Sequence, residues 1–247
     1  MTRVLILGGN GLLGPHVVRE LERDYQLVVS DIAPIETNHE SIVVDIADWD
    51  QVRAAAAGCD AIVNCSVLRP DRTLAFDVNT RGTWNAVRAA VEQGHARFIN
   101  TGPRFTIVGP SYLDYDFDIR EEIPPHPGTG LYALTKSLGQ EVCRVFAAQH
   151  PIHVLTLLFS SFVEPEPASP TAGMNPFALT FADAARAVRC ALEVDLARLP
   201  SRCEAFFMSV DLPQGQVRCG KAKKLLGWEP QDQLEGHFRA HPAAHDA

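Results

Sequence analysis

Short apolar runs alternate with segments of helical periodicity along most of the chain. This alternation predicts a parallel sheet with helices on both faces, that is, an α/β fold with a doubly wound parallel sheet. Ligands of such sheets bind beyond the carboxyl ends of the strands. The predicted strands cover residues 3–7, 26–30, 41–44, 61–64, 96–101 and 153–159, and the predicted helices cover residues 49–57, 73–93 and 131–149.

A glycine-rich turn follows the first predicted strand. Within residues 4–14, VLILGGNGLLG, Gly9, Gly11 and Gly14 satisfy G-x-G-x-x-G, and Gly8, Gly11 and Gly14 satisfy the wider G-x-x-G-x-x-G spacing. In such a strand, turn and helix, one glycine permits the sharp reversal and another lets the backbone approach a pyrophosphate. The last glycine lets the helix pack closely on the strand. The pattern predicts a Rossmann-type fold that binds a dinucleotide at the helix N-terminus.

The second predicted strand leads to an acidic residue, Asp31. A carboxylate at this place can accept hydrogen bonds from both ribose hydroxyls and repels a 2′-phosphate, which favours NAD over NADP. A glycine-rich turn can also occur without any ligand. Its place after the first strand, with Asp31 at the end of the next, favours the dinucleotide.

Polar residues also follow the other predicted strands, notably at Asp45 and at residues 64–67. Asp45 could accept a hydrogen bond from an adenine amino group, and Asp48 could cap the helix that follows. Asn79 and Gly82 fall inside a predicted helix, where both residue types are unfavourable. We therefore expect a packing or ligand-binding reason for them.

Composition narrows the class of protein. A chain of 247 residues with 46% hydrophobic content can form one large domain, or one domain and a small appendage. The net charge of −8 argues against a nucleic-acid partner. The six cysteines form no C-x-x-C and no Cys/His metal spacing, so we expect reduced thiols and no metal. No apolar segment has the length of a signal peptide or a membrane span, and we expect a cytoplasmic protein without membrane association.

The strongest chemical signal is the segment Tyr132-Ala-Leu-Thr-Lys136. On a helix, residues four apart lie on one face, so the Lys136 ammonium can stand beside the Tyr132 phenol. A neighbouring positive charge favours the phenolate and lowers the pKa of a tyrosine. Such a tyrosine can exchange a proton with a substrate hydroxyl near neutral pH.

Over nearly its whole length the chain resembles the extended short-chain dehydrogenases/reductases of the NAD-dependent epimerase/dehydratase family. The matching features occur in the family's order. They are the glycine turn with Gly8, Gly11 and Gly14, the acidic residues Asp31 and Asp45, the segment Asn79-Thr80-Arg81-Gly82-Thr83, the lead-in from Glu121 to Tyr132, Tyr132 with Lys136, the helix entry Phe181–Ala185, and the segment Lys224-Leu-Leu-Gly-Trp-Glu-Pro230.

The resemblance implies hydride transfer between a substrate carbon and nicotinamide C4, with Tyr132 handling the hydroxyl proton. Lys136 would hold the nicotinamide ribose and tune Tyr132, and a Ser or Thr would polarise the reacting oxygen. The residues expected to hold NAD are Gly8, Gly11, Leu12, Leu13, Gly14, Asp31, Asp45, Ile46, Cys65, Ser66, Asn79, Tyr132 and Lys136.

The chain departs from the family where the catalytic hydroxyl is expected. Residues 101–109 are TGPRFTIVG, and no alignment of this segment supplies a serine. Counting back five residues from Gly109 places Arg104 at the position of the catalytic hydroxyl, whereas counting forward from the strand end places Gly102 or Pro103 there. Thr101 or Thr106 could replace the hydroxyl, and Arg104 could polarise a carbonyl or clamp a carboxylate as a bidentate donor.

The chain is also short after the sixth predicted strand. We assign residues 1–160 to an NAD-binding Rossmann domain and residues 161–247 to a small substrate-binding portion, with residues 237–247 expected to be disordered. The size favours a small-molecule substrate smaller than a nucleotide-sugar. Free sugars, sugar acids and other carbonyl metabolites stay open.

Two functions follow from these features. The first is an NAD-dependent oxidoreductase or epimerase that acts on a sugar-like or other hydroxyl or carbonyl substrate, with Tyr132, Lys136, Thr101 and Arg104 as candidate catalytic residues. The alternative is a catalytically silent NAD-binding sensor or scaffold of the same fold, which the missing serine favours. The resemblance further implies a homodimer, formed by the helices around residues 73–93 and 131–149.

Overall fold

A computed structural model gives the structure of the chain. It describes residues 1–68, 71–109, 119–165, 178–210, 218–232 and 234. The expected disordered tail, residues 237–247, lies outside these ranges. None of the helices in the described ranges is long and apolar enough to span a membrane.

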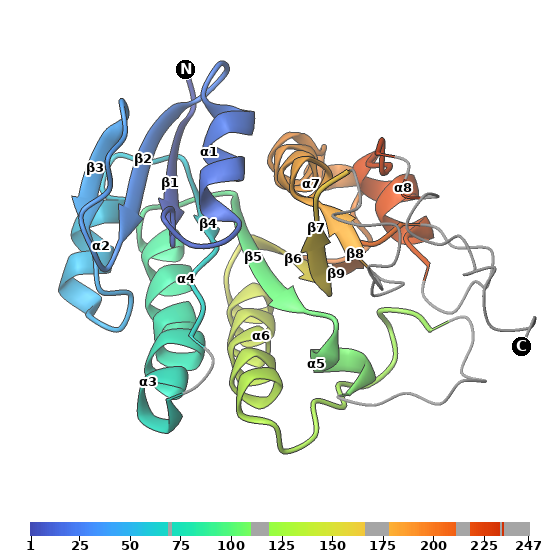
Figure 1. The fold of residues 1–247 in the computed structure, drawn as a ribbon. Coiled ribbons are helices and arrows are strands. Elements are labelled where there is room, and N and C mark those ends of the chain that lie inside the picture. Colours follow the sequence, from blue (N-terminus) through green and yellow to red (C-terminus); the bar gives the residue numbers. More distant parts are fainter. Residues whose placement is uncertain (69–70, 110–118, 166–177, 211–217, 233, 235–247) are drawn as a thin grey trace, which may run out of the picture.

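A seven-stranded parallel sheet forms the centre of the molecule (Figure 1). Its strand order is β3-β2-β1-β4-β5-β6-β9, so the chain winds outward from β1 in one direction and then from β4 in the other. The predicted doubly wound fold is confirmed. The strands are β1 (Arg3–Leu7), β2 (Gln26–Asp31), β3 (Glu40–Val43), β4 (Ala61–Asn64), β5 (Arg97–Pro103), β6 (His153–Phe159) and β9 (Cys203–Phe207).

Helices cover both faces of the sheet and enclose two separate hydrophobic cores. On one face α1 (Gly14–Leu21) packs beside α7 (Phe181–Glu193). On the other face α2 (Trp49–Ala56), α4 (Gly82–Glu92) and α6 (Leu131–Gln149) lie side by side (Figure 1). Alternate residues of the buried strands point to opposite cores, as the pleat requires.

The remaining elements are short. They are α3 (Arg72–Phe76), the π-helical turn η1 (Asp77–Arg81), α5 (Phe105–Val108), the 3₁₀ turn η2 (Leu196–Arg198), α8 (Gly220–Leu226), and the strands β7 (Ser161–Val163) and β8 (Ala178–Thr180), which pair only with each other.

The elements after residue 160 partly belong to the same sheet. Strand β9 pairs in parallel with β6 and adds the edge strand that the apolar pattern missed. Helix α7 is tied to α1 by Arg189, whose guanidinium reaches Glu20 at 2.6 Å and Asp24 at 2.7 Å. The C-terminal part of the chain therefore completes the Rossmann layers.

The helix predicted over residues 73–93 is divided into α3, η1 and α4, and both unfavourable residues have a packing reason. A Cβ at Gly82 would lie 2.7 Å from Ile46 Cγ2, so only glycine lets the loop after β3 pack on this helix. Asn79 is fully buried in the π turn. Its amide donates to Leu68 O and Thr135 Oγ1, and its oxygen accepts from Leu68 N.

A buried histidine makes the stability of the fold depend on pH. His95 is 5% exposed, and its Nε2 lies 2.7 Å from the carbonyl oxygen of Cys59. Burial lowers the pKa of His95, so the native state keeps the ring neutral. Below about pH 6.5 the unfolded chain binds a proton that the native chain excludes. The free energy of unfolding therefore decreases as the pH falls.

We expect a His95→Gln variant to lose less stability than the wild type between about pH 7.5 and about pH 5.5, because glutamine keeps a donor for Cys59 and cannot be protonated. Urea unfolding at the two pH values measures the difference. The exposed His126, changed to Gln, serves as the control and should follow the wild type. An identical loss of stability in the His95 variant would contradict the prediction.

Candidate active site

Three glycines of the turn between β1 and α1, Gly8, Gly9 and Gly14, have no room for a side chain. Gly8 has φ +79°, and a Cβ there would lie 2.7 Å from Ser66 N. A Cβ at Gly9 would lie 2.3 Å from Val29 Cγ1, and one at Gly14 would lie 2.4 Å from Gly8 O. The turn therefore packs directly against β2, against the residues after β4 and against the start of α1. This close packing leaves the backbone accessible on the side where a pyrophosphate would lie.

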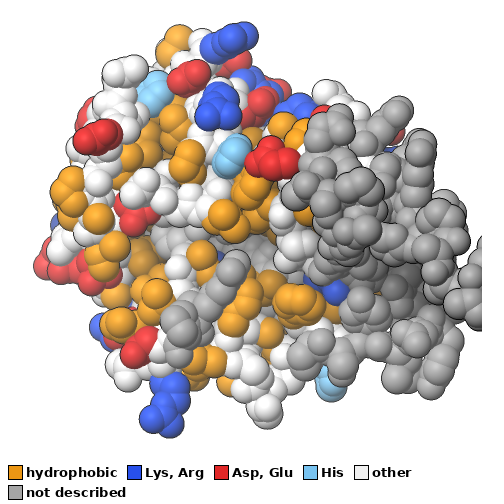
Figure 2. All heavy atoms as spheres, in the orientation of Figure 1, with side chains coloured by type: hydrophobic (Ala, Val, Ile, Leu, Met, Phe, Trp, Pro, Cys, Tyr) orange, Lys and Arg blue, Asp and Glu red, His pale blue; other side chains and the backbone are white. Residues whose placement is uncertain are grey.

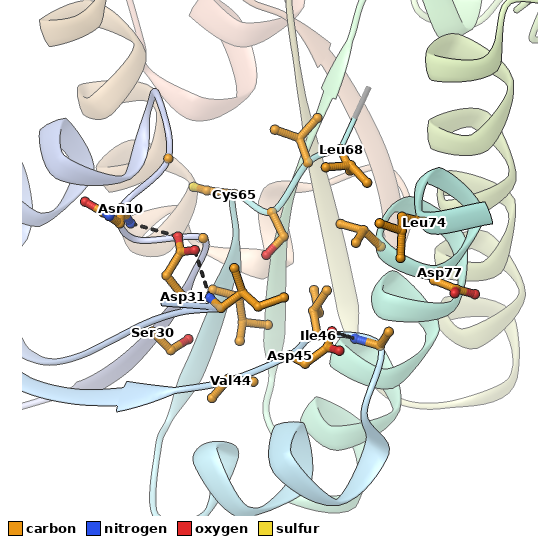
Figure 3. Close-up of a pocket in the computed structure, with 18 residues that line it drawn as sticks. Asn10, Ser30, Asp31, Val44, Asp45, Ile46, Cys65, Leu68, Leu74 and Asp77 are labelled. Atoms are coloured by element: carbon orange, nitrogen blue, oxygen red, sulfur yellow. Dashed lines mark hydrogen bonds between the residues drawn. The ribbon is translucent and has the colours of Figure 1, made fainter. Parts of the chain in front are cut away.

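A cavity of about 290 Å³ opens at the carboxyl ends of β1, β2 and β4 and beside the loop after β3 (Figure 3). Asp31 lies on one side of it and Leu74 on the other, and hydrophobic side chains gather around the hollow on this face of the molecule (Figures 2 and 3). Seven of the predicted cofactor residues line the cavity: Gly8, Gly11, Asp31, Asp45, Ile46, Cys65 and Ser66.

Asp31 presents its carboxylate to this cavity. One oxygen accepts a hydrogen bond from Asn10 N at 3.0 Å, and the other accepts from Ile32 N at 2.8 Å. Each carboxylate oxygen can accept a second hydrogen bond, which leaves acceptors for a ribose diol. Asn10 is part of the glycine turn, so the turn itself orients Asp31. The geometry fits the adenosine half of NAD.

The loop after β3 supplies the second carboxylate. Asp45 Oδ1 accepts from Ala47 N at 2.9 Å, and Asn85 of α4 holds the loop by donating to Ile46 O at 2.8 Å. Asp48 caps α2 by accepting from Gln51 N at 3.1 Å, as one of the two sequence-based interpretations expected. Asp45 is thus left to line the cavity.

Other predicted cofactor residues lie outside the cavity lining. Leu12 is 58% exposed, whereas Leu13 is buried in the core beside α1. Gly14 begins α1. The amide of Asn79 is bonded to Leu68 and Thr135, so it shapes the wall of the cavity through the loop after β4.

Lys136 joins α6 to the carboxyl ends of two neighbouring strands. Lys136 is 3% exposed, and its ammonium donates to Ser66 O at 2.7 Å and to Thr101 O at 3.2 Å. Because Ser66 lines the cavity, this bond places the ammonium beside the cavity wall. Burial raises the pKa of the neighbouring Cys65 thiol to about 12, and the Lys136 charge opposes this rise. Tyr132 precedes Lys136 by one turn of α6, on the same face.

The two candidate threonine hydroxyls are committed to backbone carbonyls. Thr101 Oγ1 donates to Asn64 O at 2.9 Å, and Thr106 Oγ1 donates to Pro103 O at 3.0 Å. A hydroxyl has a single proton to donate, so neither threonine polarises a substrate oxygen in this arrangement. Both side chains are buried.

Arg104, unlike the two threonines, is bonded to a side chain of the neighbouring segment. Its side chain is 3% exposed, and its Nε donates to Ser160 Oγ, at the end of β6, over 3.0 Å. A Cβ at Gly102 would lie 2.5 Å from Gln140 Nε2, so a side chain there would displace the Gln140 amide. The sequence placed Asn64 at a strand end, but it did not identify Gln140 or Ser160 near the catalytic segment, because no local motif contains them.

Known proteins resemble this chain in sequence and in fold. A family model described as "NAD dependent epimerase/dehydratase family" matches residues 4–194. The chain belongs to this family. The resemblance found in the sequence is confirmed, and NAD is the cofactor of the family, as Asp31 and the glycine turn predict.

Curated relatives of this family member match over different lengths. The 3-beta-hydroxysteroid dehydrogenase of Mycolicibacterium neoaurum is 30% identical over 122 residues, which are 43% of this chain and 33% of that protein. The uronate dehydrogenase of Agrobacterium fabrum is 29% identical over 154 residues, 59% of this chain and 56% of that protein. These alignments span a third to just over half of the relatives' lengths.

Solved structures share the fold. The uronate dehydrogenase from Agrobacterium tumefaciens superposes with a TM-score of 0.82 at 22% identity, covering 100% of this chain and 92% of that chain. A UDP-galactose 4-epimerase superposes with a TM-score of 0.74 at 18% identity, covering 96% of both chains. At such identities the likeness concerns the architecture.

We expect Asp31→Asn to weaken NAD binding about tenfold, because the variant loses charge-assisted hydrogen bonds to the ribose. The preference for NAD over NADP should narrow as well, since the repulsion of a 2′-phosphate is removed. Isothermal titration calorimetry with both dinucleotides measures this. Asp50→Asn removes the same charge outside the cavity and serves as the control. Unchanged NAD affinity in Asp31→Asn would place the ribose elsewhere.

Proposed function

We propose that the protein is an NAD-dependent oxidoreductase or epimerase in which Tyr132 is the general acid/base. The observation that carries the proposal is the buried Lys136 ammonium, held by Ser66 O and Thr101 O beside the cofactor cavity. Burying a lysine in this way costs free energy unless its ammonium is fully hydrogen-bonded. A charge held at this point favours the Tyr132 phenolate.

The proposed site has two ends, one that binds the adenosine and pyrophosphate and one that transfers the proton. The glycine turn and Asp31 hold the adenosine and pyrophosphate, and Asp45 lies where it can accept from the adenine. Tyr132 Oη takes a proton from a substrate hydroxyl, or returns one to a carbonyl oxygen. Lys136 stabilises the phenolate and binds the nicotinamide ribose. Bound NAD supplies the hydride acceptor at nicotinamide C4.

The substrate we propose is a small sugar-like molecule, or another molecule with a hydroxyl or carbonyl group. Residues 1–160 would hold NAD, and the part after residue 160 would frame the substrate as well as complete the sheet. The bond between Arg104 and Ser160 supports this division. Strand β7 begins directly after Ser160, so the bond joins the end of β5 to the part of the chain that would frame the substrate. Arg104 then acts at the substrate end of the site and takes the place of the family's hydroxyl residue.

We expect Tyr132→Phe to lower turnover by at least about a hundredfold and to weaken NAD binding much less, because the variant loses the proton-transfer group and only one hydrogen bond to the nicotinamide ribose. The assay follows NADH formation with a panel of sugars, sugar acids and alcohols. Tyr25→Phe is the matched control, since Tyr25 is partly buried, bonds Glu193 and does not line the cofactor cavity. NAD binding without turnover on any member of the panel would favour the silent NAD-binding alternative, and turnover that Tyr132→Phe leaves unchanged would contradict the role of Tyr132.

We also propose a homodimer formed through α4 and α6. Helix α6 carries Leu138 and Val145 on its surface, 40% and 46% exposed, beside α4. The two residues lie about two turns apart on one face of the helix, and large apolar side chains exposed on one helix face are typical of an interface. Sedimentation velocity should give twice the chain mass of 27.0 kDa for the wild type. The double variant Leu138→Glu/Val145→Glu should sediment as a monomer, and a monomeric wild type would contradict the assembly.

A further inference from the structure

The Lys136 ammonium is held by carbonyls that belong to two different strands. Ser66 O lies after β4, and Thr101 O lies within β5. The place of the ammonium therefore depends on how the ends of these strands are aligned. The register of β4 with β5 extends only to the pair Asn64 and Asn100, so the carbonyls that bind Lys136 lie just beyond the last paired residues.

Asn64 connects the ends of β4 and β5 beyond their last paired residues. Its side-chain oxygen accepts from Ser66 N at 3.1 Å, and its backbone oxygen accepts from Thr101 Oγ1 at 2.9 Å. One residue is thus bonded to both residues whose carbonyls hold Lys136. These bonds take over where the regular ladder between β4 and β5 ends.

The side-chain nitrogen of Asn64 is held by two further polar side chains. Its Nδ2 donates to Asn100 Oδ1 at 3.2 Å and lies 3.4 Å from Thr83 Oγ1. Asn64 and Asn100 are 1% and 2% exposed. Buried hydrogen bonds of this kind lock a side chain in one orientation, because breaking one leaves an unsatisfied polar group.

From this arrangement we infer that Asn64 and Thr101 are positioning residues for the catalytic pair. They align Ser66 O and Thr101 O, and through these carbonyls they set the place of the Lys136 ammonium relative to the Tyr132 phenol. The inference rests on the proposed function of that pair. It gives Thr101 a role different from the one suggested by the sequence, since its hydroxyl acts on Asn64 and its carbonyl acts on Lys136.

The ionisation of Tyr132 reports on this alignment without any substrate. Titration of tyrosinate absorbance in the NAD-free protein, minus the titration of Tyr132→Phe, isolates Tyr132. In Thr101→Val the side chain keeps its shape and loses the bond to Asn64. We expect the midpoint of Tyr132 ionisation to rise by about one pH unit, because a displaced Lys136 ammonium stabilises the phenolate less. Thr101→Ser keeps the hydroxyl and should restore the wild-type midpoint.

Two further variants complete the test. Asn64→Ala removes the bond to Ser66 N and should raise the midpoint in the same direction. Thr156→Val is the control, because it replaces a buried threonine of the neighbouring strand β6 by the same residue, valine. It should leave the midpoint of Tyr132 ionisation unchanged. Circular dichroism on each variant shows that it is folded.

A wild-type midpoint in folded Thr101→Val and Asn64→Ala would overturn the inference. A midpoint that rises equally in Thr156→Val would also overturn it, because the effect would then be general loosening. The titration needs no turnover, so its result is separate from the proposed activity. If the titration shows the shifts but no substrate is turned over, the positioning stands and the proposed function fails.

Discussion

The whole site depends on the close approach of three chain segments at the glycine turn. Gly8, Gly9 and Gly14 each lie where a Cβ would overlap a neighbouring atom, at 2.7, 2.3 and 2.4 Å. These contacts bring the end of β1 against the backbone after β4 and the start of α1 against the turn. Substitution at Gly8 or Gly14 requires backbone to move, because the obstructing atoms there are backbone atoms, and substitution at Gly9 requires the Val29 side chain to move.

The short segment after β4 contacts both the glycine turn and Lys136. The backbone of Cys65 and Ser66 packs against Gly8, and the carbonyl of Ser66 accepts from Lys136 Nζ. The glycine turn and Lys136 are therefore positioned by the same short segment, which Asn64 and Asn79 hold in place. Because the distance between the two ends is set by packed backbone, NAD would span a rigid frame.

The sequence predicted the parts of the molecule whose signals are local. Six strands, the glycine turn and the face shared by Tyr132 and Lys136 follow from periodicity and spacing over short stretches. Strand β9 was missed because Glu204 interrupts its apolar run, and the ion pair with Lys221 at 2.9 Å that satisfies this residue is made from α8. The bonds of Thr101 and Arg104 likewise depend on partners in other strands, which no local pattern contains.

A crystal structure with NAD bound tests the central claim most directly, since the claim is that cofactor cavity and catalytic pair form one site. The account predicts the adenosine ribose on Asp31, the pyrophosphate on the glycine turn, and the nicotinamide ribose within hydrogen-bonding distance of both Lys136 Nζ and Tyr132 Oη. A nicotinamide ribose that contacts neither side chain would contradict it.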